Sequence, residues 1–175
     1  MDLLDLYERG SDWTTAKVAG AVSKLDAPTP CDEWDVHTLL NHMLDTQRYF
    51  LGSARGEDVS PPAPTPPEIL GDDPLADFVR TRNDMLESYG APGVIDKTGP
   101  SLGIAFSDAL LHGWDLAKAT KQDTTMPKCL PEAAYEMIHG RFTEEQRKGV
   151  FKPEIKVPAD ASAQDKLLAY TGRRA

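Results

Sequence analysis

The sequence predicts an all-α protein, an antiparallel four-helix bundle with extra short helices near the C-terminus. Three observations favour this fold class: apolar residues recur at helical spacing in four long segments, almost no segment alternates apolar and polar residues, and the chain has no internal repeat. Its 175 residues match the length of one ordinary domain. We therefore expect a single domain over residues 1–175.

The first two predicted helices are separated by a turn that contains proline. Apolar residues recur at helical spacing from Leu3 to about Leu25, and Pro28 then stops the first helix. Asp35 can accept a hydrogen bond from the free backbone N–H groups of the next helix, as an N-cap residue does. Because the apolar stripe that follows continues to Phe50, we predict a second long helix.

A long loop is predicted over residues 52–74, because its many glycines and prolines prevent regular structure. Loops of this length are unusual in a compact domain and often act as lids, but we favour a solvated connector between antiparallel helices. Asp73 and Pro74 have the pattern of an N-cap followed by proline at the first helical position. They predict a third helix that ends near Gly90.

The remaining predicted helices are one long and two short. The fourth helix spans about Leu102 to Thr120 and is rich in alanine and leucine. Pro131 begins a fifth helix, and residues 158–168 predict an extended piece followed by a short last helix.

Charge and cysteine content exclude several classes of function. The chain has 19 Lys and Arg against 28 Asp and Glu, so it gains nothing from the phosphate attraction that dominates nucleic-acid binding. No apolar run reaches the ~20 residues of a membrane span, and the N-terminus lacks the pattern of a signal peptide. Cys31 and Cys129 form no CxxC motif, which excludes a disulfide framework and a thiolate zinc cluster. We expect a cytoplasmic protein that binds neither nucleic acid nor membranes.

Histidine and aspartate residues on the second and fourth predicted helices could hold a metal ion. His112 follows Asp108 by four residues, which places both on one helix face, and Asp115 falls on the same face. Such a pair can offer two ligands to one ion, although a surface ion pair explains the spacing equally well. His42 lies in the apolar stripe of the second helix, where an imidazole needs either a hydrogen-bond partner in the core or a metal ion. If the two helices face each other, His42, Asp108 and His112 converge.

Three separated motifs resemble those of one protein family. The run TPCDEWDVHTLLNH at 29–42 resembles a signature of the mycothiol-dependent maleylpyruvate isomerase N-terminal domain. The run HGWDLAKAT at 112–120 resembles a second segment of that family. Residues 157–174 are similar to the C-terminus of a short, single-domain subgroup described as metal-binding proteins. The resemblance covers nearly the whole chain, with the motifs in the family's order.

The resemblance implies a DinB-like four-helix bundle with a divalent metal ion at one end. In that family the ligands are a histidine on the second helix and a Glu-xxx-His pair on a later helix. Carried over by position, the metal ligands of this chain are His42, Asp108 and His112, with aspartate where the family usually has glutamate. Since the additional C-terminal domain of the isomerase is absent, we expect a reaction other than maleylpyruvate isomerisation itself.

A site of this kind predicts a metal-dependent enzyme, because three protein ligands leave positions open for water or substrate. Zinc suits two imidazoles and one carboxylate best, with nickel, iron and manganese as alternatives. The resemblance suggests mycothiol as a low-molecular-weight thiol cofactor, which the ion would hold as thiolate. We predict a thiol-dependent transferase or isomerase that acts on a small electrophile, as a monomer or homodimer. The alternative is a non-catalytic protein of the same fold that binds a small molecule or a metal ion.

The remaining candidate residues receive smaller roles. Asp115 is the first candidate to hold a metal-ligating histidine in orientation through the ring nitrogen that does not bind the ion, with a capping carboxylate as the alternative. Trp34 and Trp114 could line a pocket, but we favour packing in the core. His37 is expected to face solvent. Cys31 precedes a helix start that could activate its thiol, but we do not assign it as a nucleophile.

Overall fold

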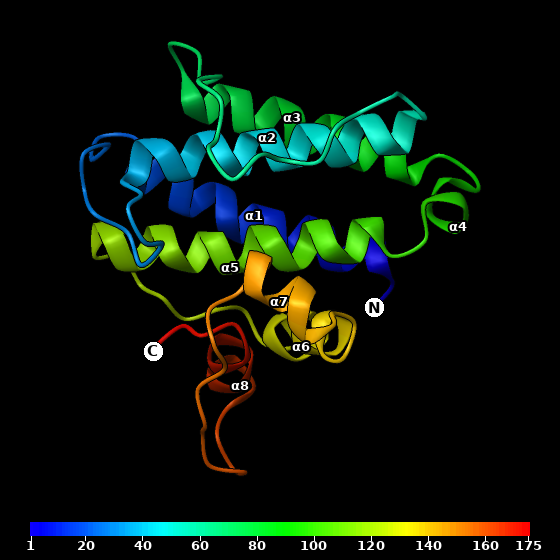
Figure 1. Ribbon diagram of the computed structural model, residues 1–175. Helices are drawn as coiled ribbons and strands as arrows, with labels where there is room; N and C mark the ends of the chain where they lie inside the picture. Colours follow the sequence, from blue (N-terminus) through cyan, green and yellow to red (C-terminus); the bar gives the residue numbers. More distant parts are fainter. The chain divides into compact units, whose positions relative to one another are not determined.

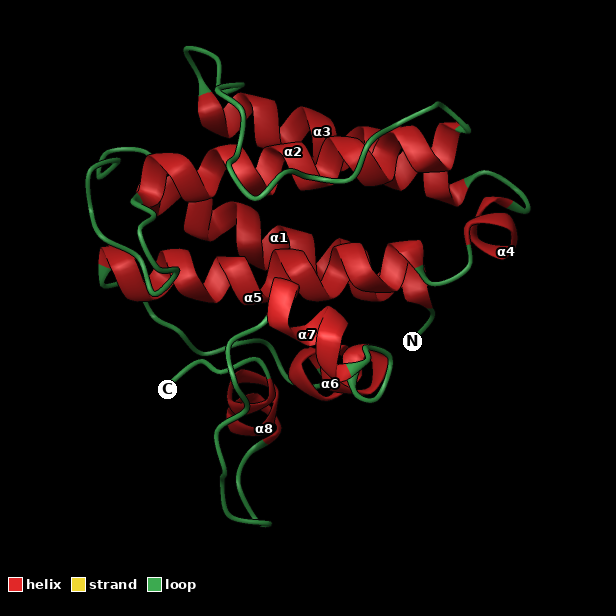
Figure 2. Cartoon of the chain, viewed as in Figure 1, coloured by secondary structure: helices red, strands yellow, loops and turns green.

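The computed structural model describes residues 1–175 and contains eight α-helices and no β-strand, as Figure 2 shows. One isolated β-bridge joins Pro28 and Asp35. The predicted all-α fold class is therefore confirmed. The chain divides into two compact units, Met1–Thr125 and Met126–Ala175. The expectation of one domain over the whole chain stays a prediction.

The first unit is a bundle of four long helices: α1 (Leu3–Ala21), α2 (Val36–Arg55), α3 (Pro74–Gly90) and α5 (Ser101–Thr120). In this unit α1 packs against α5, α2 packs against α3, and α2 also contacts α5 (Figure 1). The short helix α4 (Val94–Thr98) lies in the connection between α3 and α5. The contact between α2 and α5 brings together the two helices that carry the predicted metal ligands.

Apolar side chains from all four long helices form the core of the bundle. Burying one such aliphatic or aromatic side chain contributes about 1.5–3 kcal/mol relative to leaving it exposed. Trp114 on α5 is the largest fully buried side chain, so the core position favoured for it is confirmed. The core cluster includes Val18, Leu39, Leu40, Leu44, Phe78 and Leu116.

Two of the long helices begin where capping residues predict. The Asp35 carboxylate accepts a hydrogen bond from the backbone N–H of Thr38 at 2.8 Å, which satisfies one free donor in the first turn of α2. Asp73 caps α3 in the same way, with Pro74 at the start of the helix. These caps determine the residue at which each helix begins.

Two helix ends differ from the prediction. The first helix ends at Ala21 rather than near Leu25, because the residues between them form turns that apolar spacing alone does not distinguish from helix. The second helix continues four residues into the predicted loop 52–74. Gly52 stays helical, and Gly56, with φ of +72°, ends the helix, since glycine adopts this left-handed conformation without steric cost.

Two glycines allow α1 and α5 to approach closely. A Cβ atom at Gly10 would lie 2.7 Å from Cε2 of Phe106, and one at Gly113 would lie 2.7 Å from Oγ1 of Thr14. A glycine inside a helix costs about 1 kcal/mol relative to alanine. Tight packing between the two helices explains why Gly10 interrupts the helical pattern of the first segment.

The long loop after α2 is tied to the bundle. Oδ1 of the buried Asn41 accepts hydrogen bonds from the backbone N–H groups of Ile69 at 2.7 Å and Leu70 at 3.1 Å. The N–H of Gly71 donates to the Asp77 carboxylate at 3.0 Å. The loop is therefore a connector whose second half is fixed against α2 and α3.

The second unit contains α6 (Leu130–Ile138), α7 (Glu144–Val150) and α8 (Ala163–Tyr170), so short helices near the C-terminus are present as predicted. Here α6 packs against α8, and the guanidinium of Arg147 lies 4.2 Å from the ring centroid of Tyr170. The sequence pattern does not indicate α4 or α7, because so few residues show no clear period. None of the helices is both long and apolar enough to cross a membrane.

Candidate metal centre

The N-cap of α2 places His42 nearly two turns inside the helix, beside α5. The His42 ring is partly buried, and its centroid lies 4.9 Å from that of His112, with the ring planes at 81°. The ring centroid of Trp34, in the turn before α2, lies 4.9 Å from the ring centroid of His42. His42 is thus packed against one aromatic ring and one imidazole of the first unit.

Asp108 and His112 lie one turn apart on α5, with 3.5 Å between Oδ1 of Asp108 and Nε2 of His112. One donor atom from each of His42, Asp108 and His112 lies within 4.8 Å of the other two. Ligands bonded to one tetrahedral ion at roughly 2.0–2.2 Å are separated from each other by about 3.4 Å. The structure therefore brings the three predicted ligands to a common point, at separations that small side-chain movements would close.

His42 has the properties of a neutral metal ligand. Burial, and then the neighbouring His112, lower the pKa of His42 to about 4, against the opposing charges of Asp108 and Asp115. The ring is therefore neutral at pH 7 and has a lone pair on one nitrogen. Its Nδ1 atom is buried and makes no hydrogen bond, which is costly for a polar atom. A divalent ion bound by this ring fits both features.

His112 is the basic member of the cluster. Burial opposes its protonation, but the charge of Asp108 and hydrogen bonds with Asp108, Asp115 and Cys31 outweigh burial and raise the pKa of His112 well above 6.5. An ion that binds this ring must replace a proton, so metal binding and proton release are coupled here.

Asp115 is fully buried and fixes the ring of His112. Its Oδ2 accepts a hydrogen bond from Nδ1 of His112 at 2.9 Å. Nε2, the nitrogen that faces Asp108, then remains as the ligand atom for an ion. A carboxylate on the outer nitrogen sets the tautomer and orientation of a metal-binding histidine. The contact between Asp115 and His112 is the one that the predicted orienting role of Asp115 requires.

Cys31 also lies beside the cluster, a position that sequence reasoning missed. Its Sγ atom is 3.4 Å from Oδ2 of Asp115 and 4.0 Å from Nδ1 of His112. The thiol reaches them because the chain between Pro28 and Asp35 folds back on itself. Cys31 belongs to no helical period, so spacing could not place it near His112. Its position in the family motif at 29–42 is the one sequence signal that could have indicated a place beside the site.

Two other predicted positions can be compared with the structure. Trp34 is partly buried and packs against the core cluster, as favoured, and its ring also contacts His42. The side chain of His37, which is expected to face solvent, is 37% exposed, and the long loop that returns over this part of α2 places Glu68 3.4 Å from its Nε2 atom.

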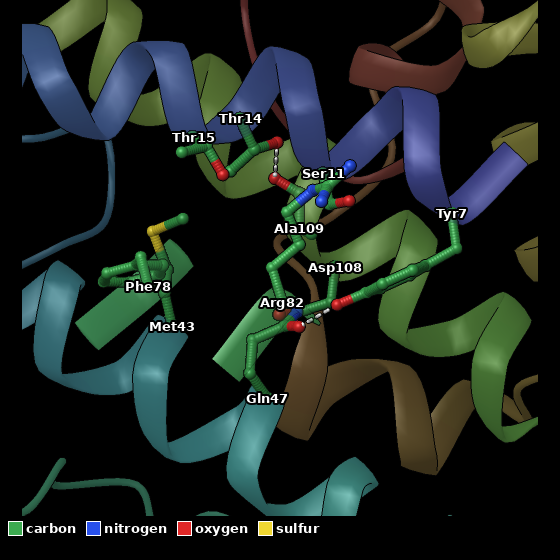
Figure 3. Close-up of a pocket in the computed structure, with 10 residues that line it drawn as sticks. All are labelled: Tyr7, Ser11, Thr14, Thr15, Met43, Gln47, Phe78, Arg82, Asp108 and Ala109. Atoms are coloured by element: carbon green, nitrogen blue, oxygen red, sulfur yellow. Dashed lines mark hydrogen bonds between the residues drawn. The ribbon is translucent and has the colours of Figure 1, made fainter. Parts of the chain in front are cut away.

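Asp108 additionally lines a cavity inside the bundle, to which all four long helices contribute (Figure 3). Arg82 lies in its wall, and the hydroxyl of Tyr7 donates a hydrogen bond to Oε1 of Gln47 across it. Burial raises the pKa of Tyr7, so its phenol stays protonated. The cavity has a volume of about 20 Å³, which is room for about one water molecule among these polar groups.

Comparison with known proteins shows the family of the chain. The family model of the mycothiol maleylpyruvate isomerase N-terminal domain matches residues 9–117, more than half of the chain. Uncharacterized proteins from two strains of Mycobacterium tuberculosis are 29% identical over 189 residues, covering 99% of this chain and 98% of the relative. No solved structure matches. The chain therefore belongs to the mycothiol maleylpyruvate isomerase N-terminal domain family.

Proposed function

We propose that the protein is a divalent-metal-dependent, thiol-using transferase or isomerase that acts on a small electrophilic molecule. The convergence of His42, Asp108 and His112 carries this proposal. Family membership supports a mycothiol-type thiol as the second reactant. Two imidazoles and one carboxylate favour zinc, with nickel, iron and manganese as alternatives.

Each residue of the cluster has a defined task in this proposal. His42 and His112 hold the ion through ring nitrogens, and Asp108 holds it through a carboxylate oxygen. A bound divalent ion keeps a coordinated thiol deprotonated at neutral pH, which makes its sulfur a nucleophile. Asp115 keeps the Nδ1 proton of His112 in place, so that Nε2 faces the ion.

Metal analysis of protein purified without a metal-chelating tag tests the proposal. We expect one divalent ion per chain, lost in His42→Ala and in His112→Ala. His37→Ala is a matched control, because it removes a partly buried histidine of the same helix that lies outside the cluster. Circular dichroism and thermal unfolding test whether each variant keeps its fold. A His42→Ala variant that retains its metal would overturn the proposal.

The thiol is tested by calorimetric titration of the zinc-loaded protein. We expect mycothiol to bind, and its S-methylated form to bind at least about tenfold more weakly, because a thioether cannot become a thiolate. Equal affinity for the two compounds would contradict coordination of the thiol sulfur at the metal centre.

The second candidate function is a non-catalytic protein of the same fold that holds a small molecule in the bundle, for which the water-sized cavity beside Asp108 would have to widen. The two functions differ in how ligand and metal depend on each other. A small molecule that binds His42→Ala as tightly as the unmodified protein supports the binding protein. Loss of the molecule together with the metal supports the enzyme.

A further inference from the structure

We propose that Cys31, His112 and Asp115 form a second cation site, selective for thiophilic ions, whose occupation excludes an ion from the proposed centre at His42. The second site stands on its own residues. Its exclusive relation to the first site rests on the proposed function, because both use the imidazole of His112.

The three donor atoms of this site lie close to the separations that ligands of one ion have. Nδ1 of His112 is 2.9 Å from Oδ2 of Asp115, which is 3.4 Å from Sγ of Cys31, and Sγ is 4.0 Å from Nδ1. A tetrahedral ion with bonds of about 2.3 Å to sulfur and 2.0–2.1 Å to nitrogen and oxygen separates its donors by about 3.3–3.6 Å. The observed separations bracket that range.

The turn that carries Cys31 is held in place before any ion binds. The backbone N–H of Cys31 donates to Oγ1 of Thr29 at 3.1 Å, and the carbonyl of Cys31 accepts from the N–H of Trp34 at 3.2 Å. The other two ligands come from the buried face of α5. The site therefore requires little ordering when it binds an ion, which limits the entropic cost of binding.

The donor types separate the two sites chemically. A cysteine thiolate is a soft ligand that selects soft ions such as copper(I) and cadmium. The cluster of His42, Asp108 and His112 contains no sulfur and accepts harder ions such as manganese. Cys31 is a free cysteine and is partly buried.

His112 can serve only one of the two sites at a time while its ring is neutral, since a neutral imidazole has one nitrogen with a lone pair. An ion at the first site takes Nε2, and Nδ1 keeps the proton that it donates to Asp115. An ion at the second site takes Nδ1 instead, and the proton then stays on Nε2, which faces Asp108. The second ion also releases the thiol proton of Cys31 to solvent. Thiophilic ions should therefore displace an ion from the first site.

Cadmium titrated into the metal-free, full-length protein tests the second site, because cadmium–thiolate bonds absorb in the ultraviolet. We expect this absorption to saturate at one equivalent and to be lost in Cys31→Ser. Cys129→Ser is the matched control, since Cys129 is the other free cysteine and lies in the second unit. His42→Ala should keep the absorption, because it removes a ligand of the first site alone.

Four outcomes of this titration overturn the second site: no absorption in the unmodified protein, absorption that survives in Cys31→Ser, loss of absorption in Cys129→Ser, or loss in His42→Ala. The last of these would make Cys31 a ligand of the first centre. If zinc analysis fails at the first centre while cadmium still binds through Cys31, the proposed function fails and the second site stands. The reverse result removes the second site and leaves the proposed function.

Exclusion is tested with manganese bound at the first site and cadmium as competitor. Electron paramagnetic resonance detects free manganese as cadmium is added. We expect manganese to be released in step with the rise of the cadmium–thiolate absorption. The Cys31→Ser variant should need at least about tenfold more cadmium for the same release, which is within the usual range of coupling between two sites. Cadmium bound through Cys31 while manganese stays bound would overturn exclusion.

Discussion

The buried contact between Asp115 and His112 allows a quantitative test of how the centre is built. Asp115→Asn keeps the size of the side chain but removes its charge, so the 2.9 Å hydrogen bond to Nδ1 becomes a neutral one at best. A hydrogen bond to a charged group contributes about 1.5–3 kcal/mol, against about 0.5–1.5 kcal/mol for a neutral one. Losing an outer partner of a metal-binding histidine commonly weakens metal affinity by about 10–100-fold. We expect a loss of that size for zinc.

Competition with a chromophoric chelator measures this dissociation constant. Asp123→Asn provides the control, because that exposed carboxylate accepts a hydrogen bond from the backbone of Thr125 and lies outside the cluster. We expect the control to bind zinc as the unmodified protein does. If Asp115→Asn folds and its zinc affinity is unchanged, the reasoning that Asp115 orients a metal-binding His112 is refuted.

Three further predictions concern the fold and are measured by urea unfolding or hydrogen exchange. Asp35→Ala should lower the free energy of unfolding by about 1 kcal/mol. The backbone N–H of Thr38 lowers the pKa of Asp35 in the folded protein. The stabilisation by the Asp35 carboxylate is therefore present above the pKa of Asp35 in the unfolded chain, and it is lost as the pH falls through its pKa in the folded protein. A difference in unfolding free energy between the two proteins that does not change with pH would contradict this reasoning. Gly10→Ala should cost about 1–3 kcal/mol by overpacking against α5, whereas Gly149→Ala, with open space around the added methyl, should not destabilise the protein. Asn41→Ala should speed exchange of the two loop amides that it accepts from, and unchanged protection would show that Asn41 does not hold the loop.

Most of the bundle could be predicted because its helices carry local signals. Apolar periods mark the long helices, and Asp35 and Asp73 mark where two of them begin. The end of α2 could not be predicted in this way, because two glycines lie near it and only one of them ends the helix. A Cβ at Gly52 would lie 2.4 Å from Val59, so this glycine accommodates the returning chain inside the helix, while Gly56 ends it. Sequence spacing does not distinguish the two.

The same distinction applies to the candidate site. His42, Asp108 and His112 lie on long helices, so helical periodicity and one assumption about facing helices were enough to predict that they meet. Cys31 approaches His112 through a folded-back turn, whose course follows from backbone hydrogen bonds that have no sequence period. The role of the trio as metal ligands stays a prediction.

Anomalous diffraction at the zinc edge, from crystals of the zinc-loaded protein, tests the central claim most directly. We predict one strong peak per chain between α2 and α5, about 2.0–2.2 Å from a nitrogen of His42, Nε2 of His112 and a carboxylate oxygen of Asp108. A zinc-loaded crystal with no peak at that point, or with the zinc bound by other residues, would contradict the account.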